Sequence, residues 1–316
     1  MNEFEIINKY FANQIVRRKD VILGIGDDAA IVQVPEGHVL LATTDTLVEG
    51  VHFQKKTLPF DIGYKSLAVN LSDLAAMGAE PCWMTLAITM PEANKKWLQA
   101  FSCGLFQLAE KFNIALIGGD TTRGPLTITI HLNGYALEKN IIRRDTAHVG
   151  DQIYVSGTLG DAGLGLEIEL NNKSISNSDA QFLLSRLNRP TPRIELGLAL
   201  RGIATSAIDI SDGLLADLQH ILDRSNVGAT IAPKHLPLSS ALIENLSLLD
   251  AQKMALIAGD DYELCFTVPK ELEDRCLQQA KQLNIPVKCI GEIEANLGLR
   301  LKDYSEKINL SGYKHF

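Results

Sequence analysis

The chain of 316 residues lacks the features that would place it outside the cytoplasm. Its five cysteines are odd in number, scattered and without a Cys-x-x-Cys pair, so they indicate reduced thiols and no disulfide framework. No uninterrupted apolar run approaches the roughly 20 residues that a membrane-spanning helix needs. The N-terminus is polar and acidic, which is not typical of a signal peptide. We therefore expect a cytoplasmic protein that does not bind a membrane.

Basic residues are fewer than acidic residues, so that the formal net charge is −8. This balance argues against a nucleic-acid-binding surface. An anionic substrate would have to be held by local Arg or Lys side chains or by a metal. The hydrophobic and charged fractions, 46% and 22%, are ordinary for a globular protein. The length favours two domains, and a polar stretch predicts the boundary, giving domains at 1–148 and 149–316.

Several catalytic signatures are missing as well. The sequence has no Walker A motif, no HExxH, no GxSxG and no His-Arg-Asp kinase motif. The glycine-rich segment 157–165 opens a predicted helix and resembles a phosphate loop, but it matches neither GxGxxG nor GxxxxGK[ST]. Residues 171–179 read as a polar linker. Any catalytic residues of this chain therefore lie outside these known motifs.

What the sequence does have is a recurring pattern of short apolar runs that end in acidic residues. It occurs at Gly24–Ala30, Leu40–Asp45, Leu71–Asp73, Ala115–Asp120, Ala207–Gly213 and Leu256–Asp261. Such acids, next to Gly, Ser and Thr, are typical Mg²⁺ ligands. If they converge, each pair at 4 Å repels by about 1 kcal/mol in water and about 4 kcal/mol at an effective dielectric of 20. We expect Asp28, Asp45, Asp73 and Asp120 to form a cluster that needs metal. The alternative for the stretch Gly24–Ala30 is a tight β-turn with solvated acids.

Six motifs together resemble the thiamine-monophosphate kinases. They are Gly24-Ile-Gly-Asp-Asp-Ala-Ala30 and the segments Thr43–Phe53, Asn70–Ala79, Ile117–Gly124, Ile208–Leu214 and Asp260–Leu264. The resemblance implies a two-domain fold of α/β and α+β type, shared with aminoimidazole-ribotide synthetase. Its N-terminal half would contribute to a dimer β-barrel and bind ATP with the help of the partner subunit, and its C-terminal domain would be mixed α+β. The implied reaction moves the γ-phosphoryl group of ATP to thiamine monophosphate, which gives thiamine diphosphate and ADP.

The resemblance also implies roles for individual residues. The implied ligands of several Mg²⁺ ions are Asp28, Thr43, Thr44, Asp45, Asp73, Asp120, Asp209 and Asp212. The implied nucleotide contacts are Gly119, Arg144 and Ser211, and the implied thiamine contacts are His52, Asp260 and Tyr313. The family commonly has Gly-Gly-Glu-Asp where this chain has Ala258-Gly259-Asp260-Asp261. The Asp260 side chain is one methylene shorter than the glutamate that the family commonly has at this position.

The chemistry agrees with the residues that are present. A phosphate monoester has its second pKa near 6, so the acceptor is mostly dianionic at pH 7 and no catalytic base is needed. Two anionic groups must approach, and metal ions held by carboxylates would offset their repulsion.

Alternatives stay open for the chain and for single residues. One is another ATP-dependent enzyme of the same fold, although the reactive Cys near the N-terminus of selenophosphate synthetases and the C-terminal Cys of the hydrogenase-maturation enzymes are both missing here. Another is a non-catalytic protein that binds metal or nucleotide. His52 is alternatively a core imidazole, and Arg144, which follows Arg143, a solvated basic residue.

Overall fold

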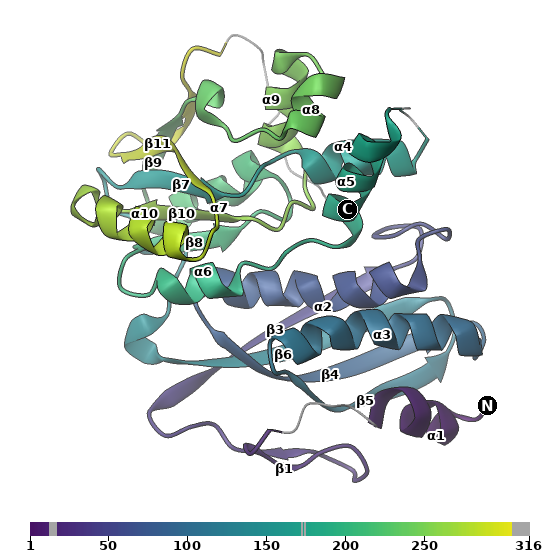
Figure 1. Cartoon of the computed structure of the whole chain (residues 1–316). Helices are drawn as coiled ribbons and strands as arrows, with labels where there is room; N and C mark the ends of the chain where they lie inside the picture. The colour runs from purple at the N-terminus through teal and green to yellow at the C-terminus, as the bar shows by residue number, and fades with distance from the viewer. Residues whose placement is uncertain (13–17, 172, 174, 305–316) are drawn as a thin grey trace. The chain divides into compact units, whose positions relative to one another are not determined.

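The computed structural model describes residues 1–12, 18–171, 173 and 175–304 (Figure 1). The chain forms two compact units. The N-terminal unit comprises Met1–Leu74 and Ala79–Lys139, and the C-terminal unit comprises Ala75–Gly78 and the chain from Asn140 onward. The predicted division at residues 148 and 149 stays a prediction. Within the described residues no helix is long and apolar enough to cross a membrane.

The N-terminal unit is built on a four-stranded mixed sheet in the order β3-β6-β4-β5. The strands are β3 (His38–Val48), β6 (Thr127–Leu137), β4 (Glu80–Met90) and β5 (Ala115–Arg123). The β4–β5 pair is parallel and the other two pairs are antiparallel. Two helices, α2 (Pro59–Ala76) and α3 (Lys95–Lys111), cover one face of this sheet (Figure 1). The first two helical segments are α1 (Glu3–Ile6) and the π-helix η1 (Ile7–Ala12).

Helices α2 and α3 pack closely because each has a glycine at their crossing. A Cβ atom on Gly63 would lie 2.1 Å from the Phe101 carbonyl oxygen, and one on Gly104 would lie 1.9 Å from the Phe60 carbonyl oxygen. The apolar faces of both helices are buried. The helical side of the sheet is therefore the core of this unit.

The other face of the sheet is polar and only partly covered. A small hairpin of β1 (Val21–Leu23) and β2 (Ile31–Val32) packs its valines against the cluster around Trp83 and Ile117. Elsewhere on this face threonines from neighbouring strands meet, as Thr46 and Thr129 do at 2.9 Å between hydroxyl oxygens. The alternation along β3 and β6 thus places mainly apolar side chains toward the helices and the threonines, except Thr43, on the opposite face.

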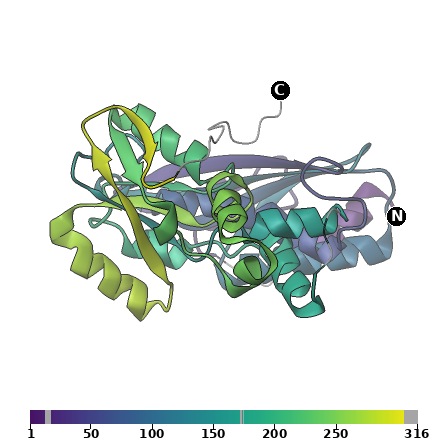
Figure 2. The same cartoon turned by 90° about the horizontal axis from the view of Figure 1, so that it is seen from above.

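The C-terminal unit contains a six-stranded mixed sheet in the order β12-β9-β11-β7-β10-β8. The strands are β7 (Gln152–Ser156), β8 (Ser206–Asp209), β9 (Gly228–Ile231), β10 (Leu264–Val268), β11 (Val287–Glu294) and β12 (Gly298–Leu301). Only β12 and β9 are parallel; every other pair is antiparallel. Figure 2 shows β11 and β12 in yellow, on either side of β9 in the sheet order.

Seven α-helices are described in this unit. They are α4 (Asp161–Glu169), α5 (Asn177–Asn188), α6 (Ile194–Ala199), α7 (Leu214–Ser225), α8 (Ser240–Asn245), α9 (Leu248–Ile257) and α10 (Glu273–Gln282). The expected linker at 171–179 is wrong in its last residues, because α5 begins at Asn177 with the Ser176 hydroxyl as its cap. The mixture of helices and sheets in both units agrees with the predicted fold class.

Candidate functional site

The first group of predicted site residues lies between β3 and α2. Thr43 and Asp45 point toward the helix, and the Thr43 hydroxyl donates a hydrogen bond to the Asp73 carboxylate. The Oδ2 atom of Asp45 is buried and has no hydrogen-bond partner among the described residues. Burial, and then repulsion from Asp73, raises the pKa of Asp45 to about 7. A buried, unpartnered carboxylate oxygen beside a second carboxylate fits a divalent cation.

Thr44 lies on the other face of the sheet, because successive side chains of a strand point to opposite sides. Its hydroxyl is 2.6 Å from Nδ1 of His131 on β6. The hydroxyls of Thr43 and Thr44 therefore diverge. The structure brings Thr43 to the acidic pair and does not bring the Thr44 hydroxyl there.

The second group lines a pocket of about 590 Å³ in the same unit. Asp28, Gly119 and Asp120 form part of its wall, and apolar side chains of α1 and η1, including Phe4 and Phe11, form another part. A Cβ atom on Gly119 would lie 1.9 Å from the Leu86 carbonyl oxygen, so only glycine fits this position of β5. The pocket thus has an apolar side and an acidic side.

The sheet register separates these two groups. Asp45 on β3 lies opposite Ile130, which lies opposite Leu86, which lies opposite Gly119 on β5. Three strand spacings of about 4.8 Å place the two edges roughly 14 Å apart. Within the described residues no three His, Cys, Asp or Glu side chains form a group able to hold a metal. The expected cluster of four acids is therefore wrong for a single N-terminal unit, which holds two separate groups.

The third group lies in the C-terminal unit, where β8 leads into α7. Asp209 ends the strand, and residues 211–213 form the loop before the helix. The Asp260 N–H donates to the Ser211 carbonyl at 2.9 Å. Asp260 itself has a φ of +67°, in the left-handed region that L-residues rarely adopt. The structure thus brings together the predicted residues Asp209, Ser211, Asp212 and Asp260.

Arg144 does not join this third group. The Arg144 carbonyl oxygen accepts a hydrogen bond from the hydroxyl of Ser225, which is the last residue of α7. Ser211 lies at the other end of this helix, before its first residue. The 12 residues of α7 span about 18 Å. Arg143 is paired with Asp145 at 2.5 Å, while the Arg144 guanidinium has no such partner in the described part of the chain. Arg144 is thus a cation available to a ligand.

The predicted thiamine contacts are described only in part. His52 follows β3, and its Nδ1 accepts a hydrogen bond of 3.1 Å from the Val48 N–H. This bond leaves the proton of a neutral ring on Nε2. Tyr313 lies outside the described residues.

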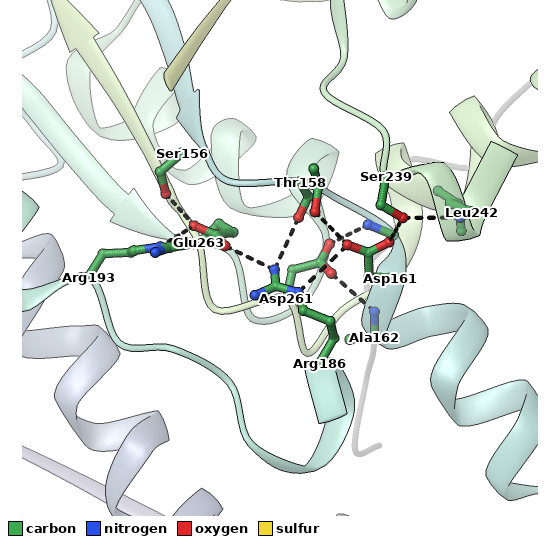
Figure 3. A network of polar contacts seen from close by, with 11 residues as sticks. Ser156, Thr158, Asp161, Ala162, Arg186, Arg193, Ser239, Leu242, Asp261 and Glu263 are labelled. Carbon is green, nitrogen blue, oxygen red and sulfur yellow. Dashed lines mark hydrogen bonds and ion pairs between the residues drawn. The ribbon is translucent and has the colours of Figure 1, made fainter. Parts of the chain in front are cut away.

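The sequence interpretation missed a buried polar network in the C-terminal unit (Figure 3). Its centre is Glu263, whose carboxylate accepts hydrogen bonds from Ser156, Arg186 and Arg193. Beside it, the fully buried Asp161 accepts hydrogen bonds from Thr158 and Ser239. The network joins the end of β7 to α4, α5 and the starts of α6 and α8, around the segment that carries Asp260.

Asp261 belongs to the same network and explains the glycine-rich segment 157–165. Its carboxylate accepts hydrogen bonds from the Gly160 N–H at 2.7 Å and the Ala162 N–H at 3.3 Å. The N-terminus of α4 is therefore already occupied by a carboxyl group that the protein itself supplies. The resemblance of this segment to a phosphate loop has a structural explanation.

Comparison with known proteins gives the family. The model for "AIR synthase related protein, N-terminal domain" matches residues 26–136, and the model for the C-terminal domain matches residues 148–303. A thiamine-monophosphate kinase of Haemophilus influenzae is 47% identical over 326 residues, covering 100% of this chain and 98% of the relative. That of Escherichia coli K12 is 47% identical over 319 residues, covering 99% and 98%. The chain belongs to the thiamine-monophosphate kinase family.

Solved structures agree with this family and with the predicted fold. The thiamine-monophosphate kinase of Stenotrophomonas maltophilia K279a superposes with a TM-score of 0.89 at 48% identity, covering 95% of this chain and 96% of the other. A structure described as "AaThiL complexed with AMPPCP and TMP" superposes with a TM-score of 0.80 at 34% identity, covering 92% of both chains. The hydrogenase maturation protein HypE of E. coli, at 22% identity and a TM-score of 0.80, shows the fold alone.

Two of the missed residues, Asp261 and Glu263, lie inside a motif that the sequence shows. Within the motif that resembles thiamine-monophosphate kinases, Asp261 and Glu263 alternate with Asp260 and Tyr262. Both acids are buried, with exposed fractions of 1% and 0%. Their place inside this motif is the signal that could have identified them. This signal does not extend to Arg186 and Arg193, which come from segments without a motif.

Proposed function

We propose that the protein transfers the γ-phosphoryl group of ATP to thiamine monophosphate and releases thiamine diphosphate and ADP. Identity of 47% along the whole chain to proteins named thiamine-monophosphate kinase supports the reaction. The structural observation that carries the proposal is the Asp45 carboxylate, which is buried, unpartnered and next to Asp73. Such a carboxylate is costly to the fold, so we infer that it serves ligand binding.

The bound cations in this proposal are several Mg²⁺ ions. One edge of the N-terminal sheet would hold Mg²⁺ through Thr43, Asp45 and Asp73. The other edge would hold Mg²⁺ through Asp28 and Asp120. Asp209 and Asp212 would contribute from the C-terminal unit, as would the backbone at Thr44. When bound, the cations offset the negative charge of the two phosphate groups that must approach each other.

The pocket of about 590 Å³ has an apolar side that suits a nucleotide base and a polar side that suits metal-bound phosphates. We assign the base to the apolar side formed by Phe4 and Phe11, and the phosphates to the side formed by Gly119 and the two acids. Ser211 and Arg144 would contact the phosphates as well. The relative whose structure is described with AMPPCP and TMP supports a site that takes an ATP analogue.

A homodimer would reconcile the separate groups. The threonine-rich face of the N-terminal sheet is only partly covered, and β3 and β5 are its edge strands in the described chain. If two such sheets close into a barrel, β3 of one subunit lies beside β5 of the other. Asp45 and Asp73 of one chain would then meet Asp28 and Asp120 of the partner subunit. The distance between Arg144 and Ser211 within one chain also favours a site shared by two chains.

The acceptor side of the site is assigned to His52, Asp260 and Tyr313. Thiamine carries a positively charged thiazolium ring, which a carboxylate such as that of Asp260 attracts. The acceptor phosphate is already mostly dianionic at pH 7, so these residues need to orient it and need not remove a proton. The side chains of this chain therefore act by binding and alignment.

The decisive experiment incubates the protein with ATP, Mg²⁺ and thiamine monophosphate and separates the products by chromatography. Equal amounts of thiamine diphosphate and ADP are expected, and an Asp45→Asn variant should form neither above background. Binding of ATP without any thiamine diphosphate would favour a non-catalytic nucleotide-binding protein. The cytoplasmic location stays a prediction, which fractionation of cells would check.

A further inference from the structure

The loop before α7 is held by a single carboxylate. The backbone N–H groups of Ser211, Asp212 and Gly213 all donate to Oδ2 of Asp217, at 3.0, 3.0 and 3.1 Å. Asp217 is the fourth residue of α7 and is buried, with an exposed fraction of 3%. Three consecutive donors on one oxygen fix the path of the loop.

The other side of the same loop is fixed by backbone hydrogen bonds. The Ser211 carbonyl accepts the Asp260 N–H at 2.9 Å, and the Ile210 carbonyl accepts the Tyr262 N–H at 2.8 Å. The backbone approach is close, since a Cβ atom on Gly259 would lie 2.3 Å from the Ser211 carbonyl oxygen. The loop therefore has little freedom to change its backbone conformation.

This arrangement determines which atoms the loop offers to a ligand. In the described part of the chain, the Ser211 hydroxyl and the Asp212 carboxylate make no side-chain hydrogen bond, whereas the backbone donors of the loop are already used. The start of a helix normally attracts phosphate through such donors. Here Asp217 occupies them, so the loop presents oxygen atoms, which bind cations.

We propose that Asp217 is a positioning residue that holds the loop in the conformation in which the Asp212 carboxylate binds the metal ion accompanying the nucleotide and the Ser211 hydroxyl contacts the phosphates. The inference rests on the proposed function, because that function places these two residues near the phosphates. Asp217 itself touches neither metal nor nucleotide in this scheme. Its effect on the reaction passes through the loop backbone.

A purely structural role makes a different prediction. If Asp217 only caps α7, its loss lowers stability and leaves the affinity for metal unchanged in the folded protein. If it positions the loop, its loss weakens the same metal site that loss of Asp212 weakens. The two roles therefore separate in a measurement of metal binding.

The experiment titrates Mn²⁺ by electron paramagnetic resonance in the presence of AMPPCP, without turnover. The Asp212→Ala variant is titrated first, and the Mn²⁺ sites whose affinity it lowers are the sites that depend on this loop. Asp217→Ala is expected to weaken that class roughly ten- to a hundredfold, as the loss of hydrogen bonds to a charged group usually does. The double variant is expected to lose no more than Asp212→Ala alone, because the two residues act on one site.

Two further variants complete the design. Asp217→Asn keeps an acceptor oxygen and the volume, so a smaller, several-fold loss of Mn²⁺ affinity is expected. Asp223→Asn, on the same helix but exposed, should bind Mn²⁺ like the wild type. In kinetics, the KM for ATP should rise in Asp217→Asn while the KM for thiamine monophosphate stays within about twofold of the wild-type value.

Wild-type Mn²⁺ affinity in folded Asp217→Ala would overturn the proposal, and so would full additivity in the double variant. If Asp217→Ala does not fold, Asp217→Asn decides, and wild-type Mn²⁺ affinity in that variant overturns it. Because the titration needs no product, it also separates this inference from the proposed function. A wild type that binds Mn²⁺ but forms no thiamine diphosphate would refute the function alone.

Discussion

The Arg193 guanidinium donates two hydrogen bonds of 2.6 Å to the Glu263 carboxylate, from Nε to Oε2 and from Nη2 to Oε1. Glu263 is completely buried, so this pair is shielded from water. Parallel bonds of this kind are strong and fix the orientation of both groups. Arg186 adds a third charge-assisted bond to the same carboxylate at 2.9 Å. The segment that carries Asp260 is therefore anchored by two arginines from outside its own strand.

Replacing Arg193 by Leu should destabilise the protein strongly. The variant leaves Glu263 with one guanidinium partner in a buried site, and breaking a buried ion pair from one side typically costs about 3–5 kcal/mol. Urea unfolding followed by circular dichroism measures this change. Arg143→Leu is the matched control, because Arg143 pairs with Asp145 on the surface, where little change is expected. Equal midpoints for Arg193→Leu and the wild type would contradict the anchoring role.

The pH dependence of stability should reveal Asp261. Burial raises the pKa of Asp261 to about 8, although the Gly160 and Ala162 N–H groups and the charge of Arg186 act in the opposite direction. Above about pH 4 the unfolded chain has released this proton while the folded protein keeps it. The contribution of Asp261 to the free energy of unfolding therefore falls as pH rises from about 4 to about 8, and is constant above that range.

Asp261→Asn removes this titration. The free energy of unfolding of the variant, relative to that of the wild type, should increase between pH 5 and pH 8. Urea unfolding at several pH values checks the difference. The exposed variant Asp223→Asn should follow the wild-type curve, and an Asp261→Asn curve parallel to the wild type would show that Asp261 is ionised in the folded protein throughout.

In the N-terminal unit, the apolar stripe of α2 and the alternation along β6 can be recognised from local pattern alone. The segment of α5 was missed because polar residues dominate its first turn, and tertiary burial of Leu183 and Leu187 determines the helix. Local pattern thus predicted the elements whose burial is regular.

The site residues stay a prediction, made as a set without their arrangement. The acids after apolar runs form a pattern in the sequence, but their distribution between two edges of a sheet depends on strand order, which the pattern does not contain. The divergence of Thr43 and Thr44 follows from the strand period once β3 is known to continue through them. Asp217 and Arg193 make their contacts through long-range folding, and no motif marks them.

Asp45→Asn should change stability and activity in opposite directions. The amide removes a buried negative charge next to Asp73, so the metal-free protein should unfold at a higher temperature than the wild type. The rate of phosphoryl transfer should fall by roughly a hundredfold or more, because the loss of a charge that stabilises the transition state usually has an effect of that size. Calorimetry and a product assay measure the two effects. Glu138→Gln, at an exposed position of the same unit, should change neither, and a fall in both quantities for Asp45→Asn would indicate a structural role for Asp45.

The strongest test of a shared site combines Asp45→Asn and Asp120→Asn in separate chains. Each variant alone should be inactive, since each lacks one acid. If Asp45 of one chain works with Asp120 of the partner subunit, a mixed dimer has one site with both acids and one with neither. Random pairing after co-expression then restores about a quarter of the wild-type activity. If both acids work within one chain, every site in the mixed dimer lacks one of them, and activity stays at background. The background level is measured with a chain that carries both substitutions, mixed with either single variant.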